Sequence, residues 1–212
     1  MILLKIIKPQ VEIIDILNEE EILKKLELIG RVCYKSEELI KEGSAGKFIK
    51  NIIKRGHESV IEHFAFSVKF VVDRGISHEI VRHRIASYSQ ESTRYCNYGN
   101  KGGEITVILP LFFDTGLGVN SNSLVYDEWK HSCEVAERKY LKLLEMGAKP
   151  EEARAVLPTS LKTELVMTAN LREWRHFLKL RTSKASHPQI REVADMLLKE
   201  LQEKLPTIFE DL

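Results

Sequence analysis

The sequence has few cysteines. Its 212 residues contain three, Cys33, Cys96 and Cys133, which are odd in number and far apart. This excludes a disulfide framework and a clustered zinc-ligand pattern, and it favours a reducing compartment. We therefore expect a cytoplasmic protein.

Long apolar runs are absent as well. No run approaches the roughly 20 residues that a membrane-spanning helix needs. Residues 1–9 are apolar, but lysines interrupt them and the segment is too short for a signal sequence. The sequence also lacks a Gly-x-Gly-x-x-Gly turn after a strand, which argues against a Rossmann-type phosphate cradle.

Neither sign of charge is in excess. The chain has 32 Lys and Arg residues against 31 Asp and Glu, a formal net charge of +1. A near-neutral chain is not expected to bind nucleic acid or a membrane over its whole surface, so any anion site must come from local clustering. The length is sufficient for one hydrophobic core, and we predict a single domain over residues 1–212.

Hydrophobic periodicity predicts a mixture of short strands and amphipathic helices. Asn18 is the expected N-cap of the first helix, Gly56 the expected C′ residue of the second, and Gly75 the expected end of the third strand. Strands are predicted at 2–7, 11–16, 64–72 and 163–169. Helices are predicted at 19–33, 44–55, 77–84, 123–146, 150–156, 172–180 and 190–205, and loops at 57–63, 85–95, 97–104 and 114–123. The expected fold is α/β (α+β), a single compact domain with a central, mostly antiparallel sheet flanked by helices.

One segment concentrates positive charge. Arg82, Arg84 and Arg94 lie close together in the chain, and a guanidinium offers a fixed fork of donors that suits phosphate oxygens. For an arbitrary pair of arginines, solvation or pairing with neighbours such as Glu79 and Glu91 is the commoner outcome. Charge density alone therefore predicts no more than a possible anion site.

The spacing in this segment is more specific than its charge. Arg82-His83-Arg84, Ser87, Ser92 and Arg94 match every fixed position of Arg-His-Arg-x2-Ser-x4-Ser-x-Arg. This pattern resembles the signature of flavin-dependent thymidylate synthases. The resemblance extends over most of the chain, through Gly56–Ser59 with Glu62-His63, Ala153–Pro158, and Asn170–Arg172 followed by His176 and Arg181.

Two positions depart from some members of that family. Ser59 stands where several have Thr, which keeps the hydroxyl group. Gln90 stands where several have Glu, which exchanges a charge for an amide. An acid–base role for Gln90 is therefore in doubt.

The resemblance implies a reaction and its co-reactants. It implies reductive methylation of dUMP to dTMP, with 5,10-methylenetetrahydrofolate as the one-carbon donor and NADPH-reduced, tightly bound FAD as the hydride source. Tetrahydrofolate would be released. It also implies a homotetramer whose FAD sites are shared between subunits. From its charge balance, apolar runs and histidine spacing, the sequence predicts no metal, nucleic acid or membrane as partner.

The resemblance also assigns site residues. Arg181 is the expected catalytic residue, because a guanidinium facing the pyrimidine can stabilise negative charge, an effect of roughly 3–4 kcal/mol. Arg94 and Arg154 are the expected phosphate ligands. The expected FAD contacts are Ser59, Arg82, His83, Arg84, Gln90, Asn170, Leu171, Arg172 and His176. The expected dUMP contacts are Glu79, Arg82, Gln90, Glu91, Ser92, Thr93, Arg94, Arg154 and Arg181.

A nucleophilic role for Ser92 is the first alternative. It would need an activating base, for which His83 and Glu91 are the nearby candidates, and no triad is evident. A positioning role is favoured for Ser92, and Cys96 is expected to be an inert thiol.

Two further alternatives concern other kinds of site. The pairs His57/His63 and His78/His83 lack the i, i+4 spacing of a helical zinc motif. A nucleic-acid surface could combine the arginines with Tyr88 and Tyr95, but the neutral charge and the absence of a recognisable binding motif oppose it.

Overall fold

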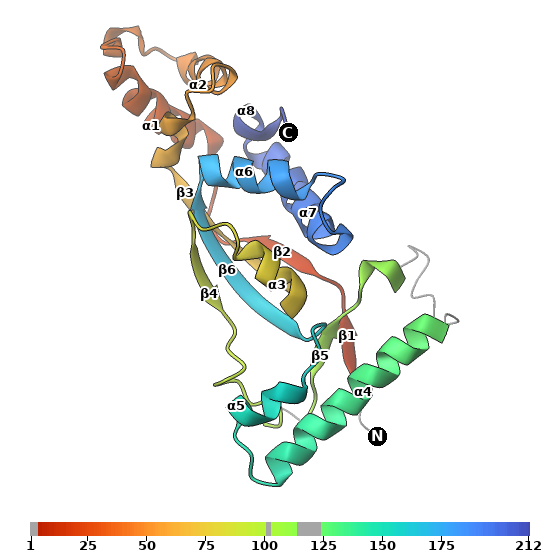
Figure 1. The fold of residues 1–212 in the computed structure, drawn as a ribbon. Coiled ribbons are helices and arrows are strands. Elements are labelled where there is room, and N and C mark those ends of the chain that lie inside the picture. The colour runs from red at the N-terminus through yellow and green to blue at the C-terminus, as the bar shows by residue number, and fades with distance from the viewer. Residues whose placement is uncertain (1–3, 101–102, 114–123) are drawn as a thin grey trace. The chain divides into compact units, whose positions relative to one another are not determined.

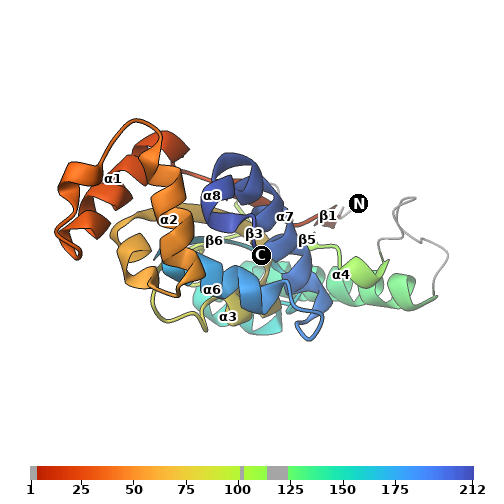
Figure 2. The same ribbon diagram turned by 90° about the horizontal axis from the view of Figure 1, so that it is seen from above.

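The computed structural model describes residues 4–100, 103–113 and 124–212. Its contacts divide the chain into two compact units. The first consists of Met1–Gln10, Phe70–Arg82 and Ser89–Leu165, and the second of Val11–Lys69, His83–Tyr88 and Val166–Leu212. Each unit is described separately (Figures 1 and 2).

Four strands form an antiparallel sheet in the order β2-β3-β6-β4. These strands are β2 (Gln10–Ile13), β3 (Ala65–Asp73), β6 (Lys162–Asn170) and β4 (Ser87–Gln90). On β6, alternate side chains are buried, as at Leu165, Met167 and Ala169, because successive residues of a strand face opposite sides of a sheet. A second, parallel pair joins β1 (Lys5–Ile7) to β5 (Thr106–Ile108). The expected mixed fold with an antiparallel sheet is confirmed.

The second unit contains most of the helices. They are α1 (Glu19–Val32), α2 (Ser44–Lys54), α6 (Leu171–Arg181), α7 (Pro188–Lys204) and α8 (Pro206–Phe209), with 3-10 turns η1 (Glu37–Leu39) and η2 (Glu58–His63). Asn18 caps α1 by accepting a hydrogen bond from the Glu21 amide, and Gly56 ends α2 at φ +72°, as expected. Helix α2 lies beside α1 and α8 (Figure 2), and α6 beside α7 (Figure 1).

The core of the second unit includes a cluster of aromatic side chains. The Phe66 ring stacks on Trp174 with centroids 5.1 Å apart, and Trp174 meets Phe177 edge-on at 5.7 Å. The Trp174 indole N–H donates to the Phe66 carbonyl at 3.2 Å, so its one polar group is satisfied inside the core. This cluster ties α6 to β3.

The first unit packs around a long helix. It contains α3 (Arg74–Ile80), η3 (Leu111–Phe113), α4 (Leu124–Glu145), α5 (Pro150–Ala153) and η4 (Arg154–Val156). Its core joins Cys133 and Tyr140 of α4 to Ile105, Val107 and Leu161. Among the described residues, no helix is long and apolar enough to cross a membrane.

The largest disagreement with the sequence prediction lies just before the arginine-rich segment. The helix expected at 77–84 runs instead from Arg74 to Ile80. The Asp73 carboxylate accepts from the Ile76 amide at 2.8 Å and starts the helix early, so Gly75 lies inside it and does not end the strand. The Arg82-His83-Arg84 segment therefore lies outside the helix, and 87–90 is a strand and not a loop.

Smaller differences concern short elements. Residues 58–63 form a 3-10 helix, with Val60 and Ile61 buried, where a loop was expected. Strand β5 and helix α8 were not predicted. The expected loop at 114–123 lies outside the described residues, as do 1–3 and 101–102.

Glu137 is a buried acid in the first unit, with no measurable exposure. Its Oε1 accepts from the Ile105 amide at 2.8 Å, whereas Oε2 has no hydrogen-bond partner among the described residues. Burial raises the pKa of this carboxyl above 4.5. Its contribution to stability is therefore present below pH 4.5 and lost as the pH rises through the higher folded-state pKa.

We predict that Glu137→Gln increases the free energy of unfolding at neutral and alkaline pH. The amide keeps an acceptor for Ile105 and removes the cost of a buried charge, about 1.4 kcal/mol for each unit of pKa shift. Denaturant unfolding from pH 4 to pH 8 measures the effect. The exposed Glu128→Gln on the same helix is the control, and equal effects of the two substitutions would contradict the prediction.

Candidate active site

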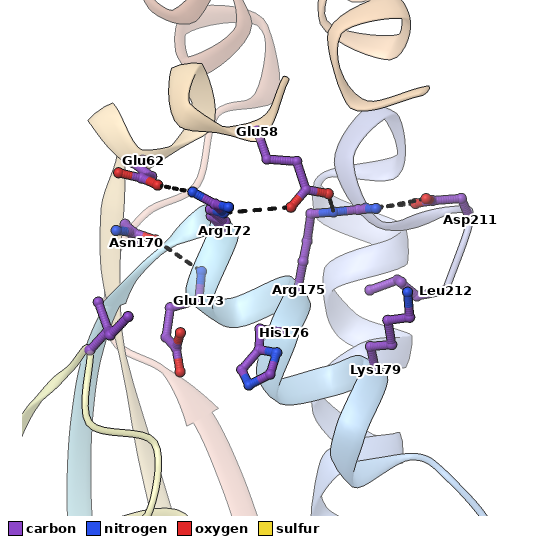
Figure 3. Close-up of a pocket in the computed structure, with 11 residues that line it drawn as sticks. Glu58, Glu62, Asn170, Arg172, Glu173, Arg175, His176, Lys179, Asp211 and Leu212 are labelled. Carbon is purple, nitrogen blue, oxygen red and sulfur yellow. Dashed lines mark hydrogen bonds and ion pairs between the residues drawn. The ribbon is translucent and has the colours of Figure 1, made fainter. Parts of the chain in front are cut away.

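A cavity of about 680 Å³ opens in the second unit, a size typical of ligand pockets (Figure 3). It contains three of the residues expected to contact FAD, namely Asn170, Arg172 and His176. The other lining residues are Glu58, Glu62, Ile85, Glu173, Arg175, Lys179, Asp211 and Leu212.

Helix α6 presents most of the polar groups of this cavity. Asn170 caps it by accepting from the Glu173 amide at 2.9 Å, so the helix begins at the end of β6. Residues 172, 175, 176 and 179 follow the i, i+3, i+4, i+7 spacing of one helix face. The opposite face buries Trp174, Phe177 and Leu178.

The two arginines of this face differ in how firmly they are held (Figure 3). Arg172 pairs with Glu62 at 2.5 Å, and both side chains are about half exposed. Arg175 is buried and makes two bonds to Asp211, at 2.6 and 2.7 Å, with Glu58 at 3.6 Å. Exposed pairs are weak and buried ones are costly to break, so Arg172 can change partners and Arg175 cannot.

A second network in the same unit joins the signature histidine to the expected catalytic arginine. The Arg181 Nε–H donates to His83 Nε2 at 3.0 Å, and His83 Nδ1 lies 3.2 Å from Glu173 Oε1. Because Arg181 is always a donor, Nε2 must carry a lone pair, and Nδ1 then holds the proton that is donated to Glu173. His83 is thus the neutral Nδ1–H tautomer.

The environment of His83 favours this neutral form. Burial lowers the pKa of His83 to about 4, and the charge of Arg181 and neighbouring His176 add to the effect. The Tyr88 hydroxyl donates to the His83 carbonyl at 2.5 Å, and burial raises the pKa of that phenol to about 12. Burial also raises the pKa of Glu173.

The side chains of His83, Glu173 and His176 also have their ligand-type atoms within 4.8 Å of one another. A metal ion there would need a lone pair on His83 Nδ1. The hydrogen bond from Arg181 leaves the proton on that atom, so the geometry favours a hydrogen-bonded network over a metal centre.

In the first unit, Glu91 is held by other side chains. Its Oε1 accepts from the Tyr98 hydroxyl at 2.9 Å, and its Oε2 accepts from Lys162 at 2.8 Å. The Gln90 amide donates to Ser77 at 2.9 Å and to Thr163 at 3.2 Å. Both side chains therefore fix the start of the 91–94 turn to the sheet.

The expected phosphate ligands belong to the same unit. Arg154 donates to the Thr93 hydroxyl at 3.1 Å, and Arg94 lies 3.8 Å from Glu151 in an exposed ion pair. The Ser92 hydroxyl accepts from the Arg94 amide at 3.2 Å, a turn-forming bond that activates nothing. Arg154 is therefore bonded to the residue that precedes Arg94 in this turn.

The two sets of predicted residues separate largely by unit. The first unit holds Glu79, Arg82, Gln90, Glu91, Ser92, Thr93, Arg94 and Arg154. The second holds Ser59, His83, Arg84, Asn170, Leu171, Arg172, His176 and Arg181. Ser59, Arg82 and Arg84 are exposed, whereas Leu171 is fully buried and its amide donates to the Phe64 carbonyl.

Sequence reasoning missed several residues that line the cavity: Glu58, Glu173, Arg175 and Asp211. For Glu173 a signal was present, because an Asn three residues before a Glu is typical of a helix start. A signal was also present for Arg175, because it follows Arg172 by three positions and so lies on the same face of the helix. No local pattern pairs Arg175 with Asp211, which is 36 positions away.

Comparisons with known proteins agree with the family resemblance. A family model described as thymidylate synthase complementing protein matches residues 14–207. The flavin-dependent thymidylate synthase of Pyrococcus furiosus is 35% identical over 177 residues, which cover 82% of this chain and 70% of the relative. That of Geobacter sulfurreducens is 35% identical over 191 residues, covering 87% and 79%. That of Corynebacterium efficiens is 33% identical over 199 residues, covering 88% and 78%.

We predict that Asp211→Asn lowers the free energy of unfolding by about 1–2 kcal/mol at neutral pH, between the values for exposed and buried pairs. The hydrogen bond from Arg175 lowers the pKa of Asp211 below 3.8. The contribution of Asp211 is therefore present above pH 3.8 and lost as the pH falls. Denaturant unfolding at pH 7 and pH 3 measures it. Glu210→Gln, which removes an exposed partner of Lys50, is the control and should change little.

Proposed function

Because the chain belongs to the family of flavin-dependent thymidylate synthases, we propose that its two groups of site residues hold FAD and dUMP for methyl transfer. The enzyme is an FAD-dependent transferase that methylates dUMP to dTMP. We further propose 5,10-methylenetetrahydrofolate as the one-carbon donor and NADPH as the reductant, with release of tetrahydrofolate. The cavity beside α6, which brings together Asn170, Arg172 and His176 of the expected FAD residues, is the observation that best supports the assigned roles.

The cavity beside α6 is suited to part of a flavin dinucleotide. Asn170 and His176 supply polar contacts, and Ile85, 71% exposed, supplies an apolar wall. Two cations of the cavity, Arg172 and Arg175, are paired with carboxylates, whereas no ion pair among the described residues engages Lys179. Opening the half-exposed pair of Arg172 with Glu62 costs only about 0–1 kcal/mol, which a charge-assisted bond to phosphate can offset. Arg84, which precedes the lining residue Ile85 in the chain, adds a further cation, since no ion pair among the described residues engages it.

The turn at 91–94 is suited to a nucleotide monophosphate. Arg94 and Arg154 offer guanidinium groups, and the Ser92 and Thr93 hydroxyls and turn amides can complete the cradle. The anchored side chains of Gln90 and Glu91 keep this turn in place without using its cations. We therefore assign Arg94 and Arg154 to the dUMP phosphate.

Arg181 is the proposed catalytic residue. Facing the pyrimidine, its guanidinium would stabilise negative charge on the uracil carbonyl oxygen or N3 and so raise the nucleophilicity of C5. Reduced flavin, when bound, supplies the hydride that completes the methyl group. Because the guanidinium keeps its charge at any working pH, this stabilisation needs no proton transfer from the protein.

We also propose a cytoplasmic homotetramer whose FAD sites are shared between subunits. The free thiols of Cys33, Cys96 and Cys133 suit a reducing compartment. Shared sites are in keeping with the exposure of Ile85 and Arg84 beside the cavity, because a neighbouring subunit could cover both. Closed symmetric assemblies of this kind are common among soluble enzymes.

Tritium release from C5-labelled dUMP tests the function. We predict release that requires methylenetetrahydrofolate, FAD and NADPH together, and a loss of about 100-fold or more in Arg181→Ala, the scale of removing one oxyanion donor. Flavin absorbance should remain, because Arg181 is assigned to the pyrimidine. The exposed Lys184→Ala, three residues later in the chain, is the control and should keep wild-type turnover.

Folded, yellow wild-type protein that releases no tritium under any combination would overturn the proposed function. Retained turnover in Arg181→Ala would overturn only the role of Arg181.

The phosphate assignment is tested by Arg154→Ala. Losing one charge-assisted bond should raise the Kd for dUMP by about 10- to 100-fold and leave FAD bound. Isothermal titration with dUMP measures the change, and the exposed Lys139→Ala of α4 is the control. An unchanged Kd would remove Arg154 from the phosphate site.

A further inference from the structure

His83 lies at the centre of the signature, and its side chain is 3% exposed. An imidazole has two polar atoms, and both are already engaged inside the chain. Nε2 accepts from Arg181 at 3.0 Å, and Nδ1 donates to Glu173 at 3.2 Å. A hydrogen bond from this ring to a flavin would have to break one of these two bonds. The His83 side chain is therefore poorly suited to be a flavin ligand.

The surroundings of His83 fix the ring. It packs edge-to-face with the Phe177 ring, with centroids 4.9 Å apart, and the His176 ring is tilted against it at 5.6 Å. The Tyr88 hydroxyl holds the His83 backbone carbonyl. Glu173 is itself placed by the Asn170 cap, through the Glu173 amide. The ring that offers an acceptor to Arg181 is thus held by two neighbouring rings, by Glu173 and through its own backbone.

Arg181 needs such a fixed partner. It is the last residue of α6, and its long side chain has several rotatable bonds that must be ordered to face a substrate. His83 is 98 positions away in the chain and approaches from the segment after α3. A bond to Nε orients the whole planar guanidinium, because the three nitrogen atoms share one plane.

We propose that His83 is a positioning residue that orients the Arg181 guanidinium through its neutral Nδ1–H tautomer, with Glu173 holding that tautomer in place. The proposal rests on the catalytic role proposed above for Arg181. It gives the side chain of the signature histidine a role on the pyrimidine side of the reaction, through Arg181.

Two amide substitutions separate the two bonds of the ring. The Gln amide reaches the position of Nε2 and keeps an acceptor for Arg181, whereas the Asn amide reaches the position of Nδ1 and keeps only the partner of Glu173. We expect His83→Asn to lower kcat by about 10- to 100-fold, the scale of misplacing a catalytic group. FAD occupancy and the KM for dUMP should change little. His83→Gln should recover most of that loss.

Two outcomes of this pair would overturn the proposal. One is an equal loss of kcat in both variants. The other is a His83→Asn protein that loses flavin but keeps wild-type kcat per bound flavin, which would make His83 a flavin ligand.

A double-mutant cycle with Arg181→Lys tests whether His83 acts through Arg181. Lysine keeps the charge but has no Nε–H in the guanidinium position, so the bond to His83 is lost. In that background His83→Asn should cost no more than about two-fold in kcat. Multiplicative losses would show that His83 acts independently of Arg181 and would overturn the proposal.

The tautomer can be measured without turnover. Long-range ¹H–¹⁵N spectra of the FAD-loaded wild type at pH 7 should show His83 protonated at Nδ1 and not at Nε2. The signals that disappear in His83→Gln identify this ring among the seven histidines. An Nε2–H tautomer would overturn the proposal whatever the activities of the variants. If the wild type methylates dUMP and His83→Asn has the same kcat, only the positioning role is contradicted. Wild-type protein that does not methylate dUMP contradicts the proposed function.

Discussion

The junction at Asn170 determines most of the candidate site. Strand β6 ends there, and the Asn170 side chain satisfies the Glu173 amide, so α6 starts at a fixed rotation. The buried Trp174 and Phe177 then leave no freedom in that rotation, because they must face the core of the second unit. With the rotation set, Arg172 and His176 face the cavity, and Glu173 faces His83. Arg181, three turns from the cap, falls where His83 can accept from its Nε–H.

The charged groups of both units are arranged on the same principle. Each unit holds a largely buried cation in a tight ion pair, Arg175 with the half-exposed Asp211 and Lys162 with the largely buried Glu91. Each also keeps cations that are exposed and weakly held, such as Arg172 and Arg94. These pairs resist exchange because leaving a buried cation without a partner is costly, so they maintain the local shape. The exposed cations exchange partners at little cost and are the ones that an anionic ligand can recruit.

The sequence predicted the long elements well and the short ones poorly. Asn18 and Gly56 mark helix ends through their own backbone and side-chain chemistry, so α1 and α2 were placed correctly. Strand β5 has three residues and is defined by its pairing with β1, which no local pattern records. Asp73 was the decisive residue for α3, because its capping bond outweighs the tendency of Gly75 to interrupt a helix. The bond of Arg175 with Asp211 could not be predicted from hydrophobic periodicity either, because it too joins residues that are far apart in the chain.

A signature names the residues of a site but not what each atom does. His83 and Glu91 both fall inside the matched segment, and both were assigned to ligands by resemblance. In the structure, the two nitrogens of His83 are engaged by Arg181 and Glu173, and the two carboxylate oxygens of Glu91 by Tyr98 and Lys162. A side chain whose polar atoms are all satisfied within the protein can gain little from a ligand, because each new bond replaces an existing one. Such residues hold other groups in place, and the groups that remain exposed beside them, Arg84 and Arg94, are the better candidates for direct contact with phosphate.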